Sequence, residues 1–363
     1  MKIGILTYHR SHNYGALLQA YALRKILSNY GHEVTFVDYW PTYHQQRYAL
    51  FSLSILKYLN WKKKLLHIIG YVRYYNSRKK RYIAFENFIT EYIYPYTSST
   101  DETYDILIYG SDQIWRKQRE IGNYNPAYFG KIFKASRHIS FAASMGELPY
   151  TEKDKLYVKK MLSNLDVISV RERELKEFVF NLGYQCRQDL DPTLLLNKDE
   201  WINSLHIVSR LKEKYILFYN LSPNTFDLQK VKDFASAMKL EVKILYSGAF
   251  KHPTPERLTT AGPADFLDLL YGADYILTSS FHGLAFALIF NKPFYASFSE
   301  NSGRAASLLE ALNLSDRMLA TGVSNPKNDK TIDWLMVNKK LTNLRANTLQ
   351  FIENDLLKDN HEN

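Results

Sequence analysis

The chain has 363 residues, of which 46% are hydrophobic, and it carries one cysteine and a formal net charge of +10 at pH 7. This length exceeds the size at which one hydrophobic core normally stops growing, so we expect two domains. The single cysteine, Cys186, excludes an internal disulfide and the usual zinc frameworks, which fits a reducing compartment. No apolar run approaches the roughly 20 residues that span a bilayer, and the N-terminus lacks the apolar region of a signal peptide. We therefore expect a soluble, cytoplasmic protein.

Taken in chain order, the first half alternates short apolar runs with helical patterns, which is typical of parallel βαβ units. A helix is expected at 15–31, and strands are expected at 2–8, 33–39, 104–110, 138–144 and 165–171. Together these elements predict a first lobe over residues 1–196, interrupted by a basic helical insertion at about 41–95.

The insertion alone could account for the whole net positive charge of the chain. Between Asp38 and Glu86 there is no acidic residue, whereas ten basic ones occur there: Arg47, Lys57, Lys62, Lys63, Lys64, Arg73, Arg78, Lys79, Lys80 and Arg81. Aliphatic and aromatic residues are interleaved with these charges. Such a stretch, 47–81, suits an anionic membrane surface or a phosphate-bearing partner. It fits an ordinary solvated helical insertion equally well.

The second half repeats the alternation and predicts a second lobe over residues 197–330. Helices are expected at 226–239, 263–273 and 282–291, and strands at 215–221, 241–247, 275–279 and 293–297. Residues 331–363 carry a long helical pattern, which we expect to pack back on the first lobe. Two such lobes enclose a cleft, and in doubly wound sheets ligands lie beyond the carboxyl ends of the strands.

Polar residues follow directly after several predicted strands of the first lobe, which makes them candidates for lining the cleft. They are Asn13, Tyr14, Gly15, Ser111, Asp112 and Ser144. None of these signals is specific, because Asn13 also fits a helix N-cap and the serines fit turns. Arg171 ends the last strand of this lobe, where a guanidinium can bind a carboxylate or phosphate in two-pronged fashion. With its acidic neighbours Glu172 and Glu174 it would alternatively form a surface ion-pair cluster.

In the second lobe, His282 interrupts a segment that otherwise reads as buried core, "YILTSSFHGLAFALIF". Its neighbours Ser279, Ser280 and Gly283 favour an anion pocket at a helix N-terminus. The structural alternative is a packed histidine bonded to a backbone carbonyl. Arg304 lies near the start of a further predicted helix, where it either reaches the cleft or forms an exposed salt bridge.

Seven stretches, in their order along the chain, resemble the polysaccharide pyruvyl transferase family. They are "NYGALLQAYAL" (13–23), "GSDQIW" (110–115), "ISFAASMG" (139–146), "ISVRE" (168–172), "DPTLLL" (191–196), the block from "GPADF" to "NKPF" (262–294) and "SGRAASLLEAL" (302–312). The resemblance runs nearly end to end, and the 262–294 block is its most specific part.

The resemblance implies an α/β fold of two Rossmann-like lobes facing a central cleft, like that of the GT-B glycosyltransferases. It implies transfer of the pyruvyl group of phosphoenolpyruvate to a sugar of a cell-surface polysaccharide precursor, as a cyclic ketal. The acceptors it implies include lipid-linked ones, such as an undecaprenyl-diphosphate-linked oligosaccharide. The protein would then work in the cytoplasm, peripherally at the inner face of the plasma membrane. No step of this reaction requires a metal or a cofactor, and no His/Asp spacing typical of a metal site occurs.

Carried over by position, the resemblance implies that Arg171 binds the carboxylate or phosphate of the donor. It implies that His282 contacts the donor and acts as acid or base. Ser279, Ser280, Gly283 and Arg304 are expected to complete the donor site. Several characterised members of the family have an arginine two residues before the histidine, where this chain has Ser280. We expect Arg304, or the amides near Gly283, to supply the missing positive charge.

Two other functions fit parts of the sequence. The first is a GT-B glycosyltransferase that uses a nucleotide sugar, since it would share the architecture. The second is a non-catalytic binding protein that acts through the basic 47–81 segment. Nucleic acid is not an expected partner, because the basic cluster is local and no RNA- or DNA-binding signature occurs.

Overall fold

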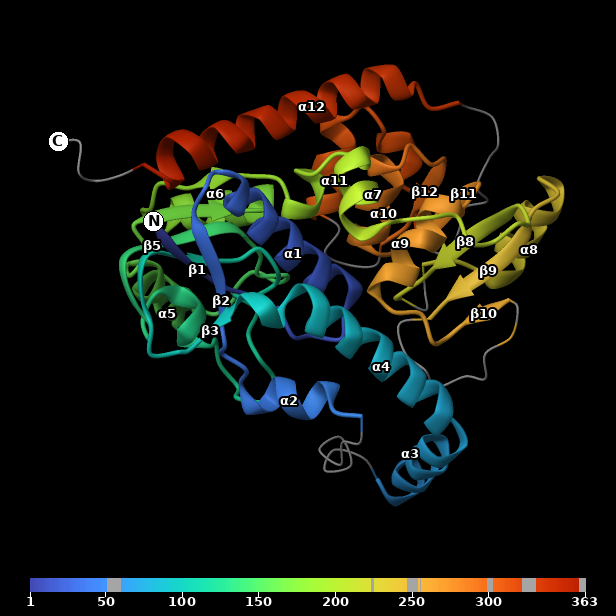
Figure 1. The fold of residues 1–363 in the computed structure, drawn as a ribbon, viewed down its shortest axis with the longest axis horizontal. Helices are drawn as coiled ribbons and strands as arrows, with labels where there is room; N and C mark the ends of the chain where they lie inside the picture. The colour runs from blue at the N-terminus through green and yellow to red at the C-terminus, as the bar shows by residue number, and fades with distance from the viewer. Residues whose placement is uncertain are drawn as a thin grey trace.

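The computed structural model describes residues 1–50, 60–222, 225–246, 254, 256–298, 303–321 and 331–358. The chain forms two α/β lobes that lie side by side, with one helix running across both (Figure 1). Within the described residues the first lobe has a sheet of seven strands and the second a sheet of five, and all their ladders are parallel. This architecture confirms the predicted GT-B-like fold of two Rossmann-like lobes.

The sheet of the first lobe has the strand order β3-β2-β1-β4-β5-β6-β7. Its strands are β1 (Lys2–Leu6), β2 (Glu33–Val37), β3 (Thr97–Ser98), β4 (Thr103–Tyr109), β5 (Lys134–Ala143), β6 (Val167–Val170) and β7 (Arg187–Gln188). Its covering helices are α1 (Tyr14–Asn29), α5 (Glu152–Leu162) and α6 (Arg173–Asn181). The central strands are near-continuous apolar runs because helices cover both faces of the sheet. The edge strands β3 and β7 span two residues each and show no periodicity from which to predict them.

The sheet of the second lobe has the strand order β10-β9-β8-β11-β12. Its strands are β8 (Tyr215–Tyr219), β9 (Glu241–Leu245), β10 (Arg257–Leu258), β11 (Tyr275–Thr278) and β12 (Phe294–Ala296). Its helices are α7 (Lys198–Leu205), α8 (Leu228–Ala237), α9 (Pro263–Gly272), α10 (Phe281–Ile289) and α11 (Gly303–Ala311). The boundary expected at residue 330 lies outside the described residues.

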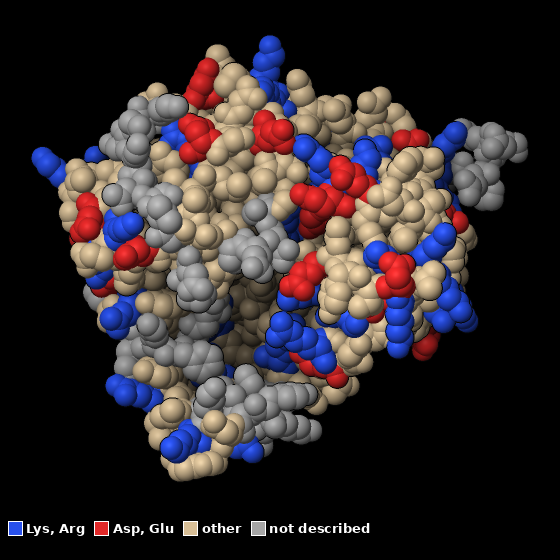
Figure 2. Space-filling view, turned by 180° about the vertical axis from the view of Figure 1, so that it is seen from behind, with Lys and Arg blue, Asp and Glu red and all other residues tan. Residues whose placement is uncertain are grey.

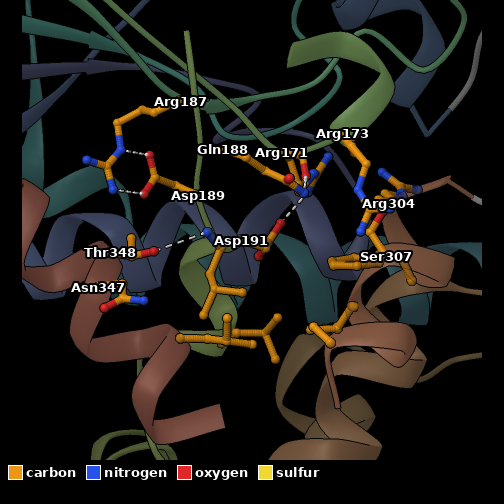
Figure 3. Close-up of a pocket in the computed structure, with 16 residues that line it drawn as sticks. Arg171, Arg173, Arg187, Gln188, Asp189, Asp191, Arg304, Ser307, Asn347 and Thr348 are labelled. Atoms are coloured by element: carbon orange, nitrogen blue, oxygen red, sulfur yellow. Dashed lines mark hydrogen bonds and ion pairs between the residues drawn. The ribbon is translucent and has the colours of Figure 1, made fainter. Parts of the chain in front are cut away.

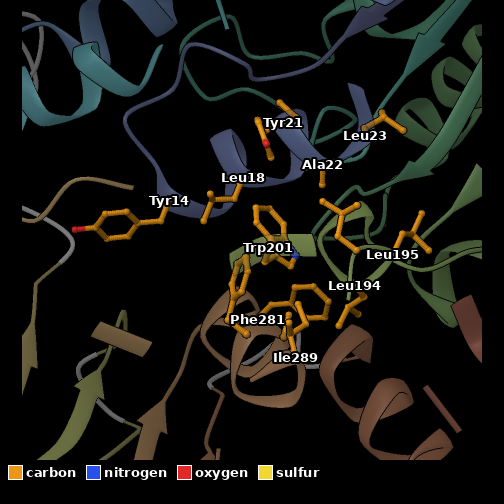
Figure 4. Close-up of a cluster of buried hydrophobic side chains, with 14 of the residues drawn as sticks. Tyr14, Leu18, Tyr21, Ala22, Leu23, Leu194, Leu195, Trp201, Phe281 and Ile289 are labelled. Atoms are coloured by element: carbon orange, nitrogen blue, oxygen red, sulfur yellow. The ribbon is translucent and has the colours of Figure 1, made fainter. Parts of the chain in front are cut away.

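The largest hydrophobic cluster among the described residues spans both lobes, and each lobe also has a cluster of its own. Figure 4 shows side chains of α1 in the first lobe, such as Leu18 and Tyr21, gathered with Trp201 of α7 and Phe281 of α10. The ring of Trp201 lies 5.8 Å from that of Tyr21 and 5.1 Å from that of Phe286. Because apolar area is buried across the boundary, separating the lobes would expose it to water.

The insertion consists of α2 (Thr42–Tyr48), α3 (Trp61–Arg73) and α4 (Tyr75–Tyr92), and residues 51–59, with Lys57, lie outside the described part. Helix α4 crosses from the first lobe to the second (Figure 1). Its buried Arg81 donates hydrogen bonds to the Tyr14 hydroxyl (2.5 Å) and to the Ala261 carbonyl (3.0 Å). A Cβ on Gly262 would lie only 2.8 Å from the Cβ of Ala84. The helix therefore braces the lobes against each other.

Helix α12 (Trp334–Phe351), with the turn Ile352–Leu356, runs back over the first lobe. Arg137 of β5 donates to the carbonyls of Asp355, Leu356 and Lys358 at 3.0–3.1 Å. The ring of Phe351 stacks on that of Phe141, and Arg345 donates to the Leu194 carbonyl. The end of the chain is thus fixed to the sheet of the first lobe, beside the segment that joins the lobes.

We predict that Arg81→Met lowers the free energy of unfolding by about 2 kcal/mol, because hydrogen bonds from a buried cation to two oxygens are lost. Lys80→Met, one residue earlier on the exposed side of α4, is the matched control and should change stability by less than about 0.5 kcal/mol. Urea unfolding measures both. Equal stability of the two variants would contradict the bracing role of Arg81.

Candidate active site

His282 is the exception in an otherwise buried helix. The other eight residues of α10 are buried, whereas the His282 side chain keeps 12% of its surface exposed. Its imidazole lies against the first lobe, so that a Cβ on Gly15 of α1 would overlap the ring. The ring therefore occupies the contact between the lobes, and only a glycine at position 15 leaves room for it.

Asp191 links His282 to Arg171. This carboxylate is fully buried, pairs with the Arg171 guanidinium, and has one oxygen 3.6 Å from His282 Nε2. Its other oxygen accepts from the backbone N–H and the hydroxyl of Thr193 at 3.0 and 2.7 Å. Burial would raise the pKa of Asp191, but Arg171 and then His282 outweigh it and hold that pKa well below its ordinary value. The carboxylate is therefore ionised throughout the physiological range.

Sequence reasoning did not single out Asp191. An aspartate before a proline is typical of a cap, and Asp191 indeed caps the short turn Pro192–Leu194. Its second role depends on the segment between the lobes passing beside α10, and the sequence carries no signal of that path. The only pointer is its place at the head of the "DPTLLL" stretch.

Two guanidinium groups lie over the ring of Phe281, the first residue of α10. The central carbon of Arg171 is 5.3 Å from the ring centroid and that of Arg304 is 5.0 Å. Arg171 Nε and Nη2 have no hydrogen-bond partner among the described residues, although Glu172 lies 3.9 Å from Nε. Arg304 has no ion pair within the described part of the chain. One cation of this pair is thus compensated by a buried carboxylate and the other is not.

The pKa values of the two arginines reflect this difference. For Arg171, burial lowers the pKa, but Asp191 and Glu172 more than offset it, so that the pKa is raised. For Arg304, burial and the charge of Arg171 lower the pKa below its ordinary value. An anion placed between them would relieve the repulsion and pair with the unbonded N–H groups.

These arginines line a cavity of about 220 Å³ (Figure 3). Arg187 and Arg173 line it as well, but each has a carboxylate partner, Asp189 at 2.7–2.8 Å and Glu310 at 3.0 Å. The other walls come from the segment after β7, from α11 and from α12. His282 does not line this cavity and is connected to its arginines through Asp191.

Two predicted residues of the first lobe border the arginine pair. Ser144 donates a hydrogen bond of 2.5 Å to Glu172, next to Arg171. The negative charge of Asp112 favours the charged form of both arginines, although the pKa of Arg304 stays below its ordinary value. The backbone carbonyl of Asp112 accepts from the Ser144 N–H at 3.2 Å. These side chains therefore shape the first-lobe side of the charged cluster.

Several other predicted residues have structural contacts within or between the lobes. Asn13 is exposed and caps α1 by accepting from the Ala16 N–H at 3.1 Å. Tyr14 is buried, with its ring 4.5 Å from that of Phe266. Ser111 is buried and donates to Gln19 at 3.0 Å.

The residues around His282 are engaged in the same way. Ser279 donates to Asn220 at 2.6 Å, and Ser280 caps α10 by accepting from the Gly283 N–H at 3.4 Å. A Cβ on Gly283 would overlap the Thr278 side chain. Ser279, Ser280 and Gly283 thus build the turn that presents His282, and their own polar groups are used in doing so.

Comparisons with known proteins relate the chain to one family. Residues 13–301 match the family model described as polysaccharide pyruvyl transferase. A search of curated proteins found no match.

Solved structures with a similar course of the chain include nucleotide-sugar enzymes. UDP-GlcNAc 2-epimerase from Methanocaldococcus jannaschii is 10% identical, with 94% of this chain and 92% of that chain covered and a TM-score of 0.44. UGT89C1 from Arabidopsis thaliana in complex with UDP is 11% identical, with coverages of 99% and 96% and a TM-score of 0.41. UDP-N-acetylglucosamine 2-epimerase from Rickettsia bellii is 11% identical, with coverages of 96% and 97% and a TM-score of 0.38. Likenesses this distant carry no argument about ligands.

We predict that Asp191→Asn lowers the free energy of unfolding by about 3–5 kcal/mol, because it leaves the Arg171 charge buried without its carboxylate. Glu310→Gln is the control, since it removes the partner of the exposed Arg173 and should cost at most about 1 kcal/mol. Chemical denaturation measures both. A wild-type midpoint for Asp191→Asn would show that Arg171 does not depend on this carboxylate.

Proposed function

The chain belongs to the polysaccharide pyruvyl transferase family, and from that premise we propose that it transfers the pyruvyl group of phosphoenolpyruvate to a sugar. The acceptor in this proposal is a precursor of a cell-surface polysaccharide, such as a lipid-linked oligosaccharide. The observation that carries the proposal is the pair Arg171 and Arg304 on the ring of Phe281, next to the Asp191–His282 contact.

The proposed donor carries the negative charges and hydrogen-bond acceptors that this arginine pair lacks. Phosphoenolpyruvate bears a carboxylate and a phosphate on a three-carbon frame, and both groups form paired hydrogen bonds with guanidinium. Arg304 brings a positive charge without a carboxylate partner among the described residues, and Arg171 brings two unbonded nitrogens. Arg304 thereby provides the charge that Ser280 does not. The cavity of about 220 Å³ is small, as a three-carbon ligand requires.

Ketal formation proceeds by two bond-forming steps at one carbon of the donor. A proton adds to the methylene carbon while the oxygen of one sugar hydroxyl bonds to the neighbouring carbon, C2, and gives up its own proton. The bond between C2 and the phosphate oxygen then breaks, and phosphate leaves with the electron pair. A second sugar hydroxyl bonds to C2 and loses its proton, so donor and acceptor alone balance the reaction.

His282 is our candidate for moving these protons. Histidine is the side chain that most often acts as general acid or base near neutral pH. Asp191 faces Nε2 from 3.6 Å, at ion-pair distance, while Gly15 packs against the other side of the ring, so the imidazole is held between the two residues. Asp191 is thus a positioning residue, itself held by Arg171.

A glycosyltransferase that uses a nucleotide sugar is the alternative. Such a donor needs an apolar slot for its base, and ligand pockets of that kind measure about 300–1,000 Å³. The cavity at Arg171 and Arg304 is smaller and is lined by four arginines, which favours a small phosphorylated acid.

We predict that two variants separate donor binding from chemistry. Arg304→Ala should raise the KM for phosphoenolpyruvate roughly 10- to 100-fold, since hydrogen bonds to a charged ligand are lost. His282→Ala should lower kcat by about 10²–10⁴-fold while the protein stays folded. The assay follows phosphate release and, by mass spectrometry, the pyruvyl increment on candidate lipid-linked oligosaccharides. Arg119→Ala, an exposed arginine elsewhere on the first lobe, is the control.

Calorimetric titration with phosphoenolpyruvate tests the donor without any acceptor. Binding of UDP-sugars in place of phosphoenolpyruvate would favour the glycosyltransferase. An unchanged KM in Arg304→Ala would remove that residue from the donor site, and wild-type turnover by His282→Ala would remove the acid–base assignment.

We also propose that α3 docks the protein on an anionic membrane, where a lipid-linked acceptor would be found. One side of this helix exposes Trp61, Leu65, Ile68 and Val72, with 71% of Trp61 and 76% of Val72 accessible. Successive members of this set are four, three and four residues apart, so they lie on one face of the helix. Exposed Lys62, Lys64 and Arg73 flank this face.

Such a helix has the pattern of one that lies in the membrane interface, with its apolar side among the lipids and its cations at the headgroups. Helix α3 protrudes at the far end of α4 (Figure 1), and basic side chains surround this end of the molecule (Figure 2). Among the described helices, none is both long and apolar enough to cross a bilayer. The contact proposed here is therefore with the membrane surface.

We predict that the protein floats with vesicles of phosphatidylglycerol and not with vesicles of phosphatidylcholine, because cations on α3 complement anionic headgroups. Val72→Glu should abolish flotation by placing a carboxylate on the apolar side. Leu335→Glu changes a residue of α12 that is 85% exposed and serves as the matched control. Absence of flotation at low salt, or equal loss in both variants, would contradict membrane docking through α3.

A further inference from the structure

A second pocket, of about 400 Å³, lies in the first lobe. The loops that follow β1 and β2 form one part of it, and α2 and α4 of the insertion form the other. It contains none of the residues discussed for the donor. We propose that it binds a neutral saccharide and, on the premise of the proposed function, that it holds the glycan of the acceptor.

The charges in this pocket are compensated in pairs. Arg10 donates to Asp38 at 2.6 Å, and His12 lies 2.8 Å from a carboxylate oxygen of Glu86. The arginine cavity of the donor differs, because Arg304 lacks such a partner among the described residues. The pocket is therefore polar without being a site for an anion.

Four of its ten lining residues are aromatic, and the guanidinium of Arg10 lies over the rings of two of them, Trp40 and Tyr94. The rings of Trp40 and Tyr48 stack with an interplanar angle of 21° and centroids 6.0 Å apart. Tyr82 packs against His12 at 4.8 Å, and the Tyr94 hydroxyl accepts from Arg10 at 3.0 Å. Aromatic side chains offer a flat apolar face together with polar edges. A sugar ring is built in the same way, with C–H groups on its faces and hydroxyls around its rim.

Polar groups stand beside these rings. The guanidinium of Arg10, the carboxylate of Glu86 and the amide of exposed Gln45 line the same pocket. Hydroxyls donate and accept, so they can bond to a carboxylate and to a guanidinium without a net charge of their own. Planar polar side chains next to aromatic faces thus match a polyhydroxylated, uncharged ligand.

The pocket lies close to the candidate acid–base residue. His12 precedes Gly15 by three residues, and three residues span at most about 11 Å. Gly15 in turn contacts the His282 ring. A glycan with one unit in the pocket can therefore place a neighbouring unit at the contact between the lobes, where the pyruvyl group would be received.

Saturation-transfer NMR tests saccharide binding directly. The probes are the methyl glycosides of glucose, galactose, mannose and N-acetylglucosamine and their disaccharides, with glucose 6-phosphate as the charged comparison. We expect signal from at least one neutral glycoside with the wild-type chain, and no stronger binding of glucose 6-phosphate. Trp40→Ala and Gln45→Ala should each raise the Kd of that glycoside at least tenfold.

Gln45→Ala keeps the test decisive if Trp40→Ala disturbs folding, because the Gln45 side chain is exposed. Tyr150→Ala, an aromatic residue that is 87% exposed elsewhere on the first lobe, should bind the glycoside as the wild type does. Absence of signal from every glycoside, or wild-type binding by both pocket variants, overturns the proposal.

Titration with phosphoenolpyruvate in the same samples separates this proposal from the proposed function. We expect Trp40→Ala and Gln45→Ala to retain wild-type affinity for phosphoenolpyruvate. If the wild type binds a glycoside and not phosphoenolpyruvate, the donor assignment falls and the saccharide pocket stands. If it binds phosphoenolpyruvate and no glycoside, the pocket assignment falls and the donor site stands.

Discussion

The buried carboxylate of Asp191 is the constraint on which the rest of the site depends. It is shared by Arg171 from the end of β6 and His282 from the start of α10, and it stands on the segment that joins the two lobes. A buried ion pair costs desolvation, and removing one partner costs more than the pair contributes. The chain can therefore keep Arg171 in the interior only while Asp191 stays in place. The stability of the fold, the arrangement of the lobes and the position of the imidazole therefore all depend on the carboxylate of Asp191.

The two pockets differ in how their charged side chains are paired. In the cavity formed by both lobes and α12, arginines exceed the carboxylates that pair with them, whereas in the pocket around Trp40 and Tyr48 each charge has a partner. The proposed reaction between an anionic donor and a neutral acceptor would need this division, because a cation without a partner in the proposed acceptor pocket would attract the donor to the wrong place. His282 is connected to the arginine cavity through Asp191, and it packs against Gly15, which follows His12 of the second pocket by three residues.

The fold was open to prediction because parallel strands buried on both faces leave long apolar runs that alternate with helical patterns. The two-residue strands β3 and β7 carry no such pattern. Arg171 and His282 stood out as polar residues at the ends of apolar runs. The same reasoning could not tell ligand binding from helix capping at Ser279 and Ser280, because a serine before a helix gives the same sequence pattern in both roles. The contacts of Asp191 and the pocket around Trp40 and Tyr48 are formed by segments far apart in sequence. The periodicity of the sequence does not show which distant segments come together.

Helix α4 has a mechanical consequence for the whole protein. Its 18 residues form a rod of roughly 27 Å that follows α3 in the chain and ends in the first lobe. The helix carries Tyr82 and Glu86, which line the pocket around Trp40 and Tyr48. Arg81, near the middle of the helix, donates a hydrogen bond to the Ala261 carbonyl of the second lobe. If a lipid surface restrained one end of this rod, it would hold in place both the spacing of the lobes and the shape of the pocket around Trp40 and Tyr48. Attachment to the bilayer and readiness for catalysis would then be one event rather than two.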